Sequence, residues 1–114
     1  MKLIIAGGRT YRLTEQDIQR LDELGATEVV SGCATGADED GQRWAESRGL
    51  PVRRFPPDWN RLGFAAGPRR NRQMAAYADA VILFPGGRGT LSMFNEARAA
   101  NITIYDGGNH DKTM

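Results

Sequence analysis

The chain has little of the side-chain chemistry that metal centres and cysteine enzymes use. Among its 114 residues there is one cysteine, Cys33, and one histidine, His110. A single cysteine excludes an intramolecular disulfide and is typical of a reducing compartment, so we expect a cytoplasmic protein. Because no histidine lies near Cys33 in the sequence, we expect this residue to be small and buried rather than nucleophilic. No group of residues has the spacing of metal ligands, and we expect neither a metal ion nor a cofactor.

The sequence also lacks a long apolar run and a large net charge. No segment approaches the ~20 apolar residues of a transmembrane helix, and we expect no membrane partner. Residues 1–6 are too short for a signal-peptide core with its flanks, and they indicate a strand instead. The formal net charge of +1 gives no overall field that would favour DNA or a membrane surface.

Positive charge is concentrated in one stretch of the sequence. Between residues 53 and 72 the only acid is Asp58, and the cations are Arg53, Arg54, Arg61, Arg69, Arg70 and Arg72. The planar guanidinium group suits phosphate or carboxylate. One alternative for this stretch is single-stranded nucleic-acid binding, with Trp59 or Phe64 stacking on bases. The near-neutral net charge and the short chain do not favour it.

What the sequence does have is a regular alternation of strand-like and helix-like segments. We expect strands at 2–6, 27–30, 51–55, 80–84 and 101–105, helices at 14–24, 37–48, 68–78 and 91–100, and irregular structure at 56–67. This order indicates an α/β fold, with a parallel sheet covered by helices on both faces. Right-handed crossovers favour the strand order 3-2-1-4-5. We expect one Rossmann-like domain over residues 1–105 and a flexible polar tail over 106–114.

The most informative segment joins the fourth strand to the helix after it. Glycines there let backbone N–H groups approach a phosphate, and a helix N-terminus adds partial positive charge. It matches neither a P-loop nor a dinucleotide G-x-G-x-x-G motif. The alternative is a tight turn in which glycine serves geometry alone. The segment is Pro85, Gly86, Gly87, Arg88, Gly89 and Thr90.

The expected strand order places the first and fourth strands side by side, where ligands bind in such sheets. The loops 7–11, 31–38 and 85–90 therefore meet at one edge. Arg9 is expected to clamp a phosphate there, and Thr90 to add a hydroxyl. Tyr11 either stacks on a base or packs against its own loop. Asp38 either stabilises a helix start or binds ribose hydroxyls.

Four motifs in this order resemble the YspA-like branch of the SLOG superfamily. They are Gly7-Gly8-Arg9 with Tyr11, Ser31-Gly32-x-Ala34-Thr35-Gly36-Ala37-Asp38, Gly67-Pro68-x-Arg70-Asn71-x-x-Met74 and Pro85-Gly86-Gly87-x-Gly89-Thr90. The resemblance spans Leu3 to Tyr105. It implies a Rossmann-like domain that binds a nucleotide or nucleotide-derived ligand, such as a phosphorylated nucleoside or an ADP-ribose-like molecule. The ligand-binding residues that we expect are Gly8, Arg9, Tyr11, Gly32, Thr35, Gly36, Asp38, Arg70, Asn71, Pro85, Gly86, Gly87, Arg88, Gly89 and Thr90.

The superfamily includes the Lonely Guy phosphoribohydrolases and the DNA-processing protein A fold. In the Lonely Guy enzymes a catalytic glutamate stands three residues after the threonine of the glycine motif, where this chain has Met93. A methionine cannot move a proton. The enzyme alternative, cleavage of the N-glycosidic bond of a nucleoside 5'-monophosphate, therefore needs Glu96 or Asp38 as its catalytic carboxylate.

The resemblance also favours a homo-oligomer. Small apolar faces on the last two expected helices offer a self-association patch. They consist of Met74, Ala75, Ala78, Phe94, Ala97 and Ala100.

Overall fold

A computed structural model describes residues 1–107, and residues 108–114, which include His110, lie outside the described part of the chain. Five parallel strands form one sheet in the order β3-β2-β1-β4-β5, which confirms the predicted topology. The strands are β1 (Lys2–Ala6), β2 (Glu28–Ser31), β3 (Val52–Arg54), β4 (Ala80–Leu83) and β5 (Thr103–Asp106). β5 thus extends one residue into the segment expected to be a tail.

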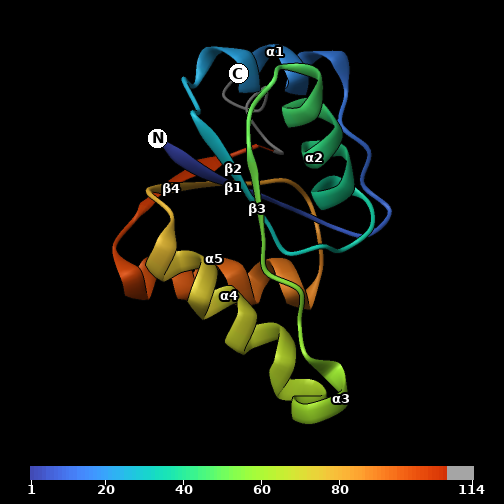
Figure 1. Ribbon diagram of the computed structural model, residues 1–114, viewed down its shortest axis with the longest axis vertical. Coiled ribbons are helices and arrows are strands. Elements are labelled where there is room, and N and C mark those ends of the chain that lie inside the picture. Colours follow the sequence, from blue (N-terminus) through green and yellow to red (C-terminus); the bar gives the residue numbers. More distant parts are fainter. Residues whose placement is uncertain (108–114) are drawn as a thin grey trace.

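Helices cover both faces of the sheet, as the alternating pattern predicts (Figure 1). On one face lie α1 (Glu15–Glu23) and α2 (Ala37–Ser47), and on the other lie α4 (Ala66–Tyr77) and α5 (Arg88–Ala100). Successive β1 side chains point to opposite faces, so Leu3 and Ile5 join the core under α1 and α2. Ile4 joins the second core, under α4 and α5. Each layer is held by apolar burial, the main favourable term in folding.

Residues 56–67, expected to be irregular, contain a short helix, α3 (Trp59–Leu62), and a 3-10 turn, Gly63–Ala65. The Asp58 carboxylate accepts from the Arg61 N–H at 3.2 Å and caps α3. α4 then begins at Ala66 rather than at Pro68. One turn of helix is too short to show a 3.6-residue apolar period, which is why the sequence did not reveal it.

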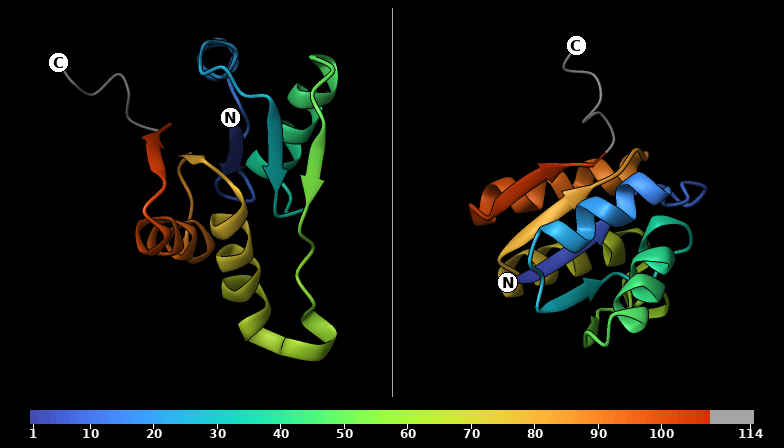
Figure 2. Two further views of the ribbon diagram at one scale, coloured as in Figure 1. Left: turned by 60° about the vertical axis from the view of Figure 1, so that its left-hand side comes forward. Right: turned by 90° about the horizontal axis from the view of Figure 1, so that it is seen from above.

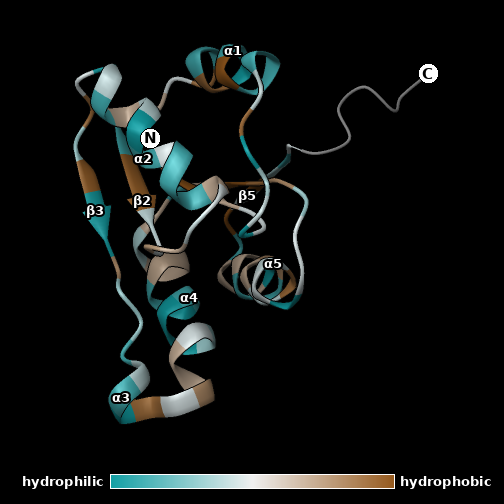
Figure 3. Ribbon diagram, turned by 90° about the vertical axis from the view of Figure 1, so that its right-hand side faces the viewer, coloured by the Kyte–Doolittle hydropathy of each residue, from teal (hydrophilic) through white to brown (hydrophobic). Residues whose placement is uncertain are grey.

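Residues 55–68 extend away from the sheet as an arm. In Figure 2 the chain leaves β3, runs outward to α3 and returns through α4. Figure 3 shows hydrophobic colour on β2 and again beside α3, at the far end of the arm. The arm therefore carries apolar side chains outside the core.

The proposed self-association patch is largely wrong, because most of its members belong to the core. Met74, Ala75, Ala78 and Ala97 are each at most 7% exposed, and they pack against the sheet in the core under α4 and α5. The homo-oligomer remains a prediction without these residues. In the described residues no helix has both the length and the apolar character needed to cross a membrane.

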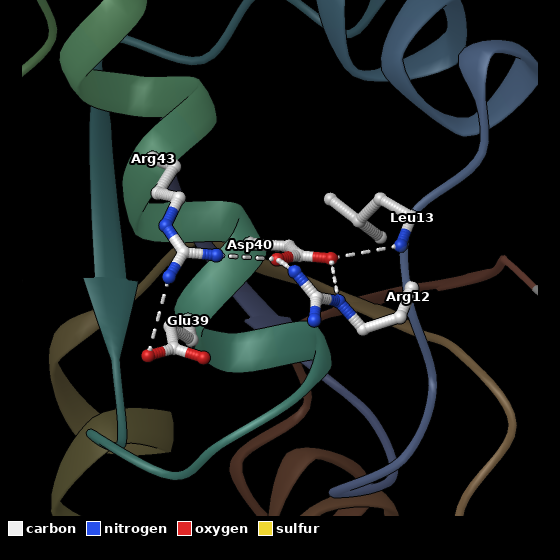
Figure 4. Close-up of polar contacts among 5 residues, drawn as sticks. All are labelled: Arg12, Leu13, Glu39, Asp40 and Arg43. Atoms are coloured by element: carbon white, nitrogen blue, oxygen red, sulfur yellow. Dashed lines mark hydrogen bonds and ion pairs between the residues drawn. The ribbon is translucent and has the colours of Figure 1, made fainter.

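A polar cluster ties the segment after β1 to α2 (Figure 4). The Asp40 carboxylate accepts two hydrogen bonds from Arg12, at 2.8 and 2.9 Å, and one from the Leu13 N–H at 3.1 Å. Arg43 adds a further contact at 3.1 Å. The hydrogen bonds from Arg12 hold the pKa of Asp40 below its usual value. The cluster fixes the path of the first loop, which borders the site described next.

Candidate functional site

The carboxyl ends of β1, β2 and β4 open onto a cavity of about 1030 Å³. Residues 6–9, residues 32–35 and residues 87–90 line it where the chain leaves these three strands. The arm and side chains of α2, α4 and α5 supply the rest of the wall. This volume lies just above the usual range for ligand pockets, about 300–1,000 Å³. The structure therefore brings the three predicted loops together around a space large enough for a small molecule.

The first turn of α5 forms one wall of this cavity. The helix starts at Arg88, three residues earlier than expected, and Gly87 occupies its N-cap position. The first N–H groups of a helix have no partner within the helix, and within the described residues no side chain caps this one. A Cβ built on Gly87 or Gly89 would meet nothing within 4 Å. These glycines therefore leave the helix start open to the cavity.

Gly8, Gly36 and Gly86 lie where the loops after β1, β2 and β4 pack closely against one another. The Gly8 N–H donates to the Pro85 carbonyl at 2.8 Å, and the Ala37 N–H donates to the Gly8 carbonyl at 3.2 Å. Gly36 has a φ of +79°, and a Cβ there would lie 2.3 Å from the Gly8 oxygen. Gly86 is equally confined, since its Cβ would lie 2.0 Å from the Thr90 hydroxyl. Of the residues at this contact between loops, Gly8 lines the cavity. Gly36, Pro85 and Gly86, which were expected to bind the ligand, do not line it.

Asp38 and Arg70 form the polar floor of the cavity. Asp38 is 6% exposed and accepts from the Ala34 N–H at 3.4 Å. Burial raises its pKa to about 6, against the opposing effects of backbone hydrogen bonds and of Arg70. The Arg70 guanidinium donates to the Gly32 carbonyl, and burial lowers the pKa of Arg70. A Cβ on Gly32 would lie 2.5 Å from this guanidinium, so a larger residue there would displace the Arg70 side chain.

Asn71 connects α4 to the start of α5. Its side chain is buried, with Oδ1 accepting from Arg70 Nε at 2.8 Å. Its Nδ2 donates to the Ser92 hydroxyl at 3.1 Å and to the Gly89 carbonyl at 3.4 Å. Asn71 therefore positions the first turn of α5 while it lines the cavity. Sequence reasoning missed Ser92, which lies one helical turn beyond Gly89.

Two arginines and two threonines that were expected to bind the ligand also line the cavity. Arg9, on the loop after β1, and Arg88, at the start of α5, are exposed, and the threonines are Thr35 and Thr90. Cys33, expected to be buried, is exposed and lines the same cavity. It has a φ of +64°, because the loop after β2 turns sharply there.

Besides Gly36, Pro85 and Gly86, two more predicted residues do not line the cavity. Tyr11 stacks on Phe84 with ring centroids 5.3 Å apart, and its hydroxyl donates to Asp17 at 2.6 Å. Burial and Asp17 raise the pKa of Tyr11 to about 12. In this structure the ring packs against the protein, and its role toward a ligand stays a prediction. Glu96 faces Arg72 at 3.5 Å and is not among the residues that line the cavity.

The arginine-rich stretch is engaged with neighbouring side chains. Arg53 lies over the rings of Phe55 and Tyr77. Ion pairs join Arg54 to Glu46, Arg61 to Asp58 and Arg72 to Glu96. These contacts use part of the positive charge that nucleic-acid binding would need.

Comparison with known proteins agrees with the resemblance found in the sequence. Residues 1–62 match the model of the "YspA, cpYpsA-related SLOG family". The chain is also 35% identical over 121 residues to the "Gene 61 protein" of Mycobacterium phage D29, an alignment that covers 94% of this chain and 96% of the phage protein. No solved structure shows significant similarity. With its sheet order, its glycine motifs and these matches, the chain belongs to the YspA, cpYpsA-related SLOG family.

Proposed function

We propose that this protein binds a phosphorylated nucleoside, or a related nucleotide-derived ligand, in the cavity at the carboxyl ends of β1, β2 and β4. Membership of the SLOG family suggests a nucleotide-related ligand. The observation that supports a phosphorylated ligand is the uncapped start of α5, which faces a large cavity bordered by Arg9 and Arg88.

The proposed phosphate site is the first turn of α5. N–H groups of Arg88, Gly89 and Thr90 belong to that turn, and a helix N-terminus favours an anion. Arg9, from the loop after β1, supplies a counter-charge across the cavity. Glycine at 87 and 89 keeps the approach clear of side-chain atoms. The proposal therefore needs no metal ion or cofactor to hold the phosphate.

Calorimetry with a panel of nucleoside 5'-monophosphates, nucleoside diphosphates and ADP-ribose tests this proposal. We expect binding by at least one phosphorylated nucleoside and a loss of at least tenfold in affinity for Gly87→Val. A Cβ at 87 would meet nothing within 4 Å, and it would stand in front of the α5 N-terminus. Thermal unfolding of Gly87→Val serves as the control for its fold. The proposal fails if no phosphorylated nucleoside binds to the wild-type protein.

A second candidate function is cleavage of the N-glycosidic bond of a nucleoside 5'-monophosphate. It is favoured by one observation, the buried Asp38 carboxyl that lines the cavity and has a pKa of about 6. Such a pKa suits a group that accepts or donates a proton near neutral pH. Glu96 lies off the cavity, which leaves Asp38 as the carboxylate for this reaction. Release of free base from AMP, abolished by Asp38→Asn, would support it, and no turnover at high enzyme concentration would exclude it.

A further inference from the structure

Aromatic side chains stand exposed at the wall of the cavity that the arm supplies. In the described part of the chain the large apolar side chains with high exposure are Trp59 at 50%, Phe64 at 98% and Leu91 at 60%. Trp59 and Phe64 both line the cavity that contains the α5 N-terminus. Exposed apolar groups gathered at a cavity mark a binding surface.

Local contacts fix the position of the Trp59 ring. Asp58 caps α3 just before Trp59, and the indole lies against α4 at Gly67. A Cβ on Gly67 would be 3.5 Å from Cη2 and 4.0 Å from Cζ3 of that indole. One edge of the ring thus lies against α4, while the residue as a whole stays 50% exposed. A supported but open aromatic surface is suited to stacking on a flat ring.

We propose that Trp59 is the stacking surface for the base of the ligand, so that the cavity takes nucleoside phosphates in preference to simple sugar phosphates. This inference rests on the proposed function, which supplies the phosphate at the start of α5. The two surfaces belong to different walls of one cavity, and a nucleotide presents its phosphate and its base at opposite ends. Because every base has a flat face, stacking on Trp59 provides affinity without strong discrimination among bases.

Binding of two probes to three proteins tests the proposal. AMP and ribose 5-phosphate share the phosphate and the sugar, and they differ in the base. We expect wild-type protein to bind AMP more tightly, and Trp59→Leu to weaken AMP binding about 5- to 100-fold while ribose 5-phosphate changes less than about twofold. Trp59→Phe, which keeps an aromatic ring, should recover part of the AMP affinity. Unchanged binding of ribose 5-phosphate shows that Trp59→Leu is folded.

Tryptophan fluorescence gives an independent readout. The chain has two tryptophans, and Trp44 is 5% exposed and donates to Asp22 at 2.9 Å, in the core under α1 and α2. AMP should quench the emission of wild-type protein and leave that of Trp59→Phe, which reports Trp44 alone, unchanged.

The outcomes separate this inference from the proposed function. If wild-type protein binds AMP and ribose 5-phosphate equally and Trp59→Leu alters neither affinity, the inference is wrong and the phosphate site stands. If neither probe nor any other phosphorylated nucleoside binds, both proposals fail. If Trp59→Leu lowers the mass of the protein in sedimentation while AMP affinity is kept, the exposed ring is a contact between copies of the chain and the inference is overturned.

Discussion

The ionisation of Asp38 is strongly altered by its surroundings. Its carboxyl is buried, and burial moves its pKa from 3.8 to about 6. Folding therefore favours the protonated form, and in the pH range between these two values the native state binds more protons than the unfolded chain. The contribution of Asp38 to the free energy of unfolding is thus fully present below pH 3.8 and is lost as the pH rises to about 6.

Replacing Asp38 with Asn removes this titration. We expect the difference in unfolding free energy between wild-type protein and Asp38→Asn to change by about 3 kcal/mol between pH 3.5 and pH 7, in favour of the variant at neutral pH. Urea denaturation at several pH values measures it. Asp40→Asn is the control. Hydrogen bonds from Arg12 lower the pKa of Asp40, so this substitution should change the pH dependence of the unfolding free energy in the opposite direction. A pH-independent difference for Asp38→Asn would show that folding does not raise the pKa of Asp38.

At the scale of elements, the start of α1 explains why Tyr11 is an aromatic residue. Thr14 and Asp17 form a reciprocal capping box, and Asp17, 1% exposed, also accepts from the Tyr11 hydroxyl. The ring itself stacks on Phe84 at the end of β4. Tyr11 therefore links the loop after β1 to α1 and to the core.

Tyr11→Phe separates structural from ligand-binding roles. The variant keeps the stacked ring and deletes a hydrogen bond to a buried carboxylate, so we expect it to cost about 1.5–3 kcal/mol of stability. Its affinity for AMP should stay within about twofold of wild type, a difference of less than 0.5 kcal/mol. Chemical denaturation and calorimetry on the same sample test both statements. A large loss of affinity without a loss of stability would mean that the Tyr11 hydroxyl contacts the ligand.

The elements that the sequence predicted are those that follow from local rules. Apolar runs, glycine stops and right-handed crossovers were enough for the strand order, and hence for the meeting of the loops after β1, β2 and β4. The same rules give no information on α3, which is one turn long, or on the early start of α5 at Arg88. A glycine-rich segment favours turns by intrinsic propensity, and packing of α5 on the sheet overrides that preference.

Side-chain direction was the part of the site that the sequence could not supply. Asn71 and Arg70 are neighbours on α4, yet both turn toward the cavity because hydrogen bonds to Ser92 and Gly32 hold them there. Glu96 is held away from the cavity by Arg72. The direction of each of these side chains depends on a partner at least 21 residues away in the chain. A local sequence pattern does not contain that information.

At the scale of the whole molecule, the net charge is too small to attract an anionic ligand, so the charges at the cavity have to do so. The formal net charge is +1, so long-range steering is weak. Arg88 and Arg98 lie in the first and last turns of α5, and ten residues of helix separate them by about 15 Å. Arg88 lines the cavity, whereas Arg98 lies over the ring of Phe94 and does not. The two arginines thus make a matched pair on one helix.

Arg88→Gln and Arg98→Gln change the net charge of the protein equally. In 50 mM salt we expect Arg88→Gln to weaken AMP binding by about 2- to 5-fold, as for an exposed charge pair, and Arg98→Gln to leave it unchanged. The Debye length falls from about 8 Å at 0.15 M to about 3 Å at 1 M. Raising the salt should therefore reduce wild-type affinity toward that of Arg88→Gln. Equal effects of the two substitutions in calorimetry would mean that overall charge, and not the cavity, attracts the ligand.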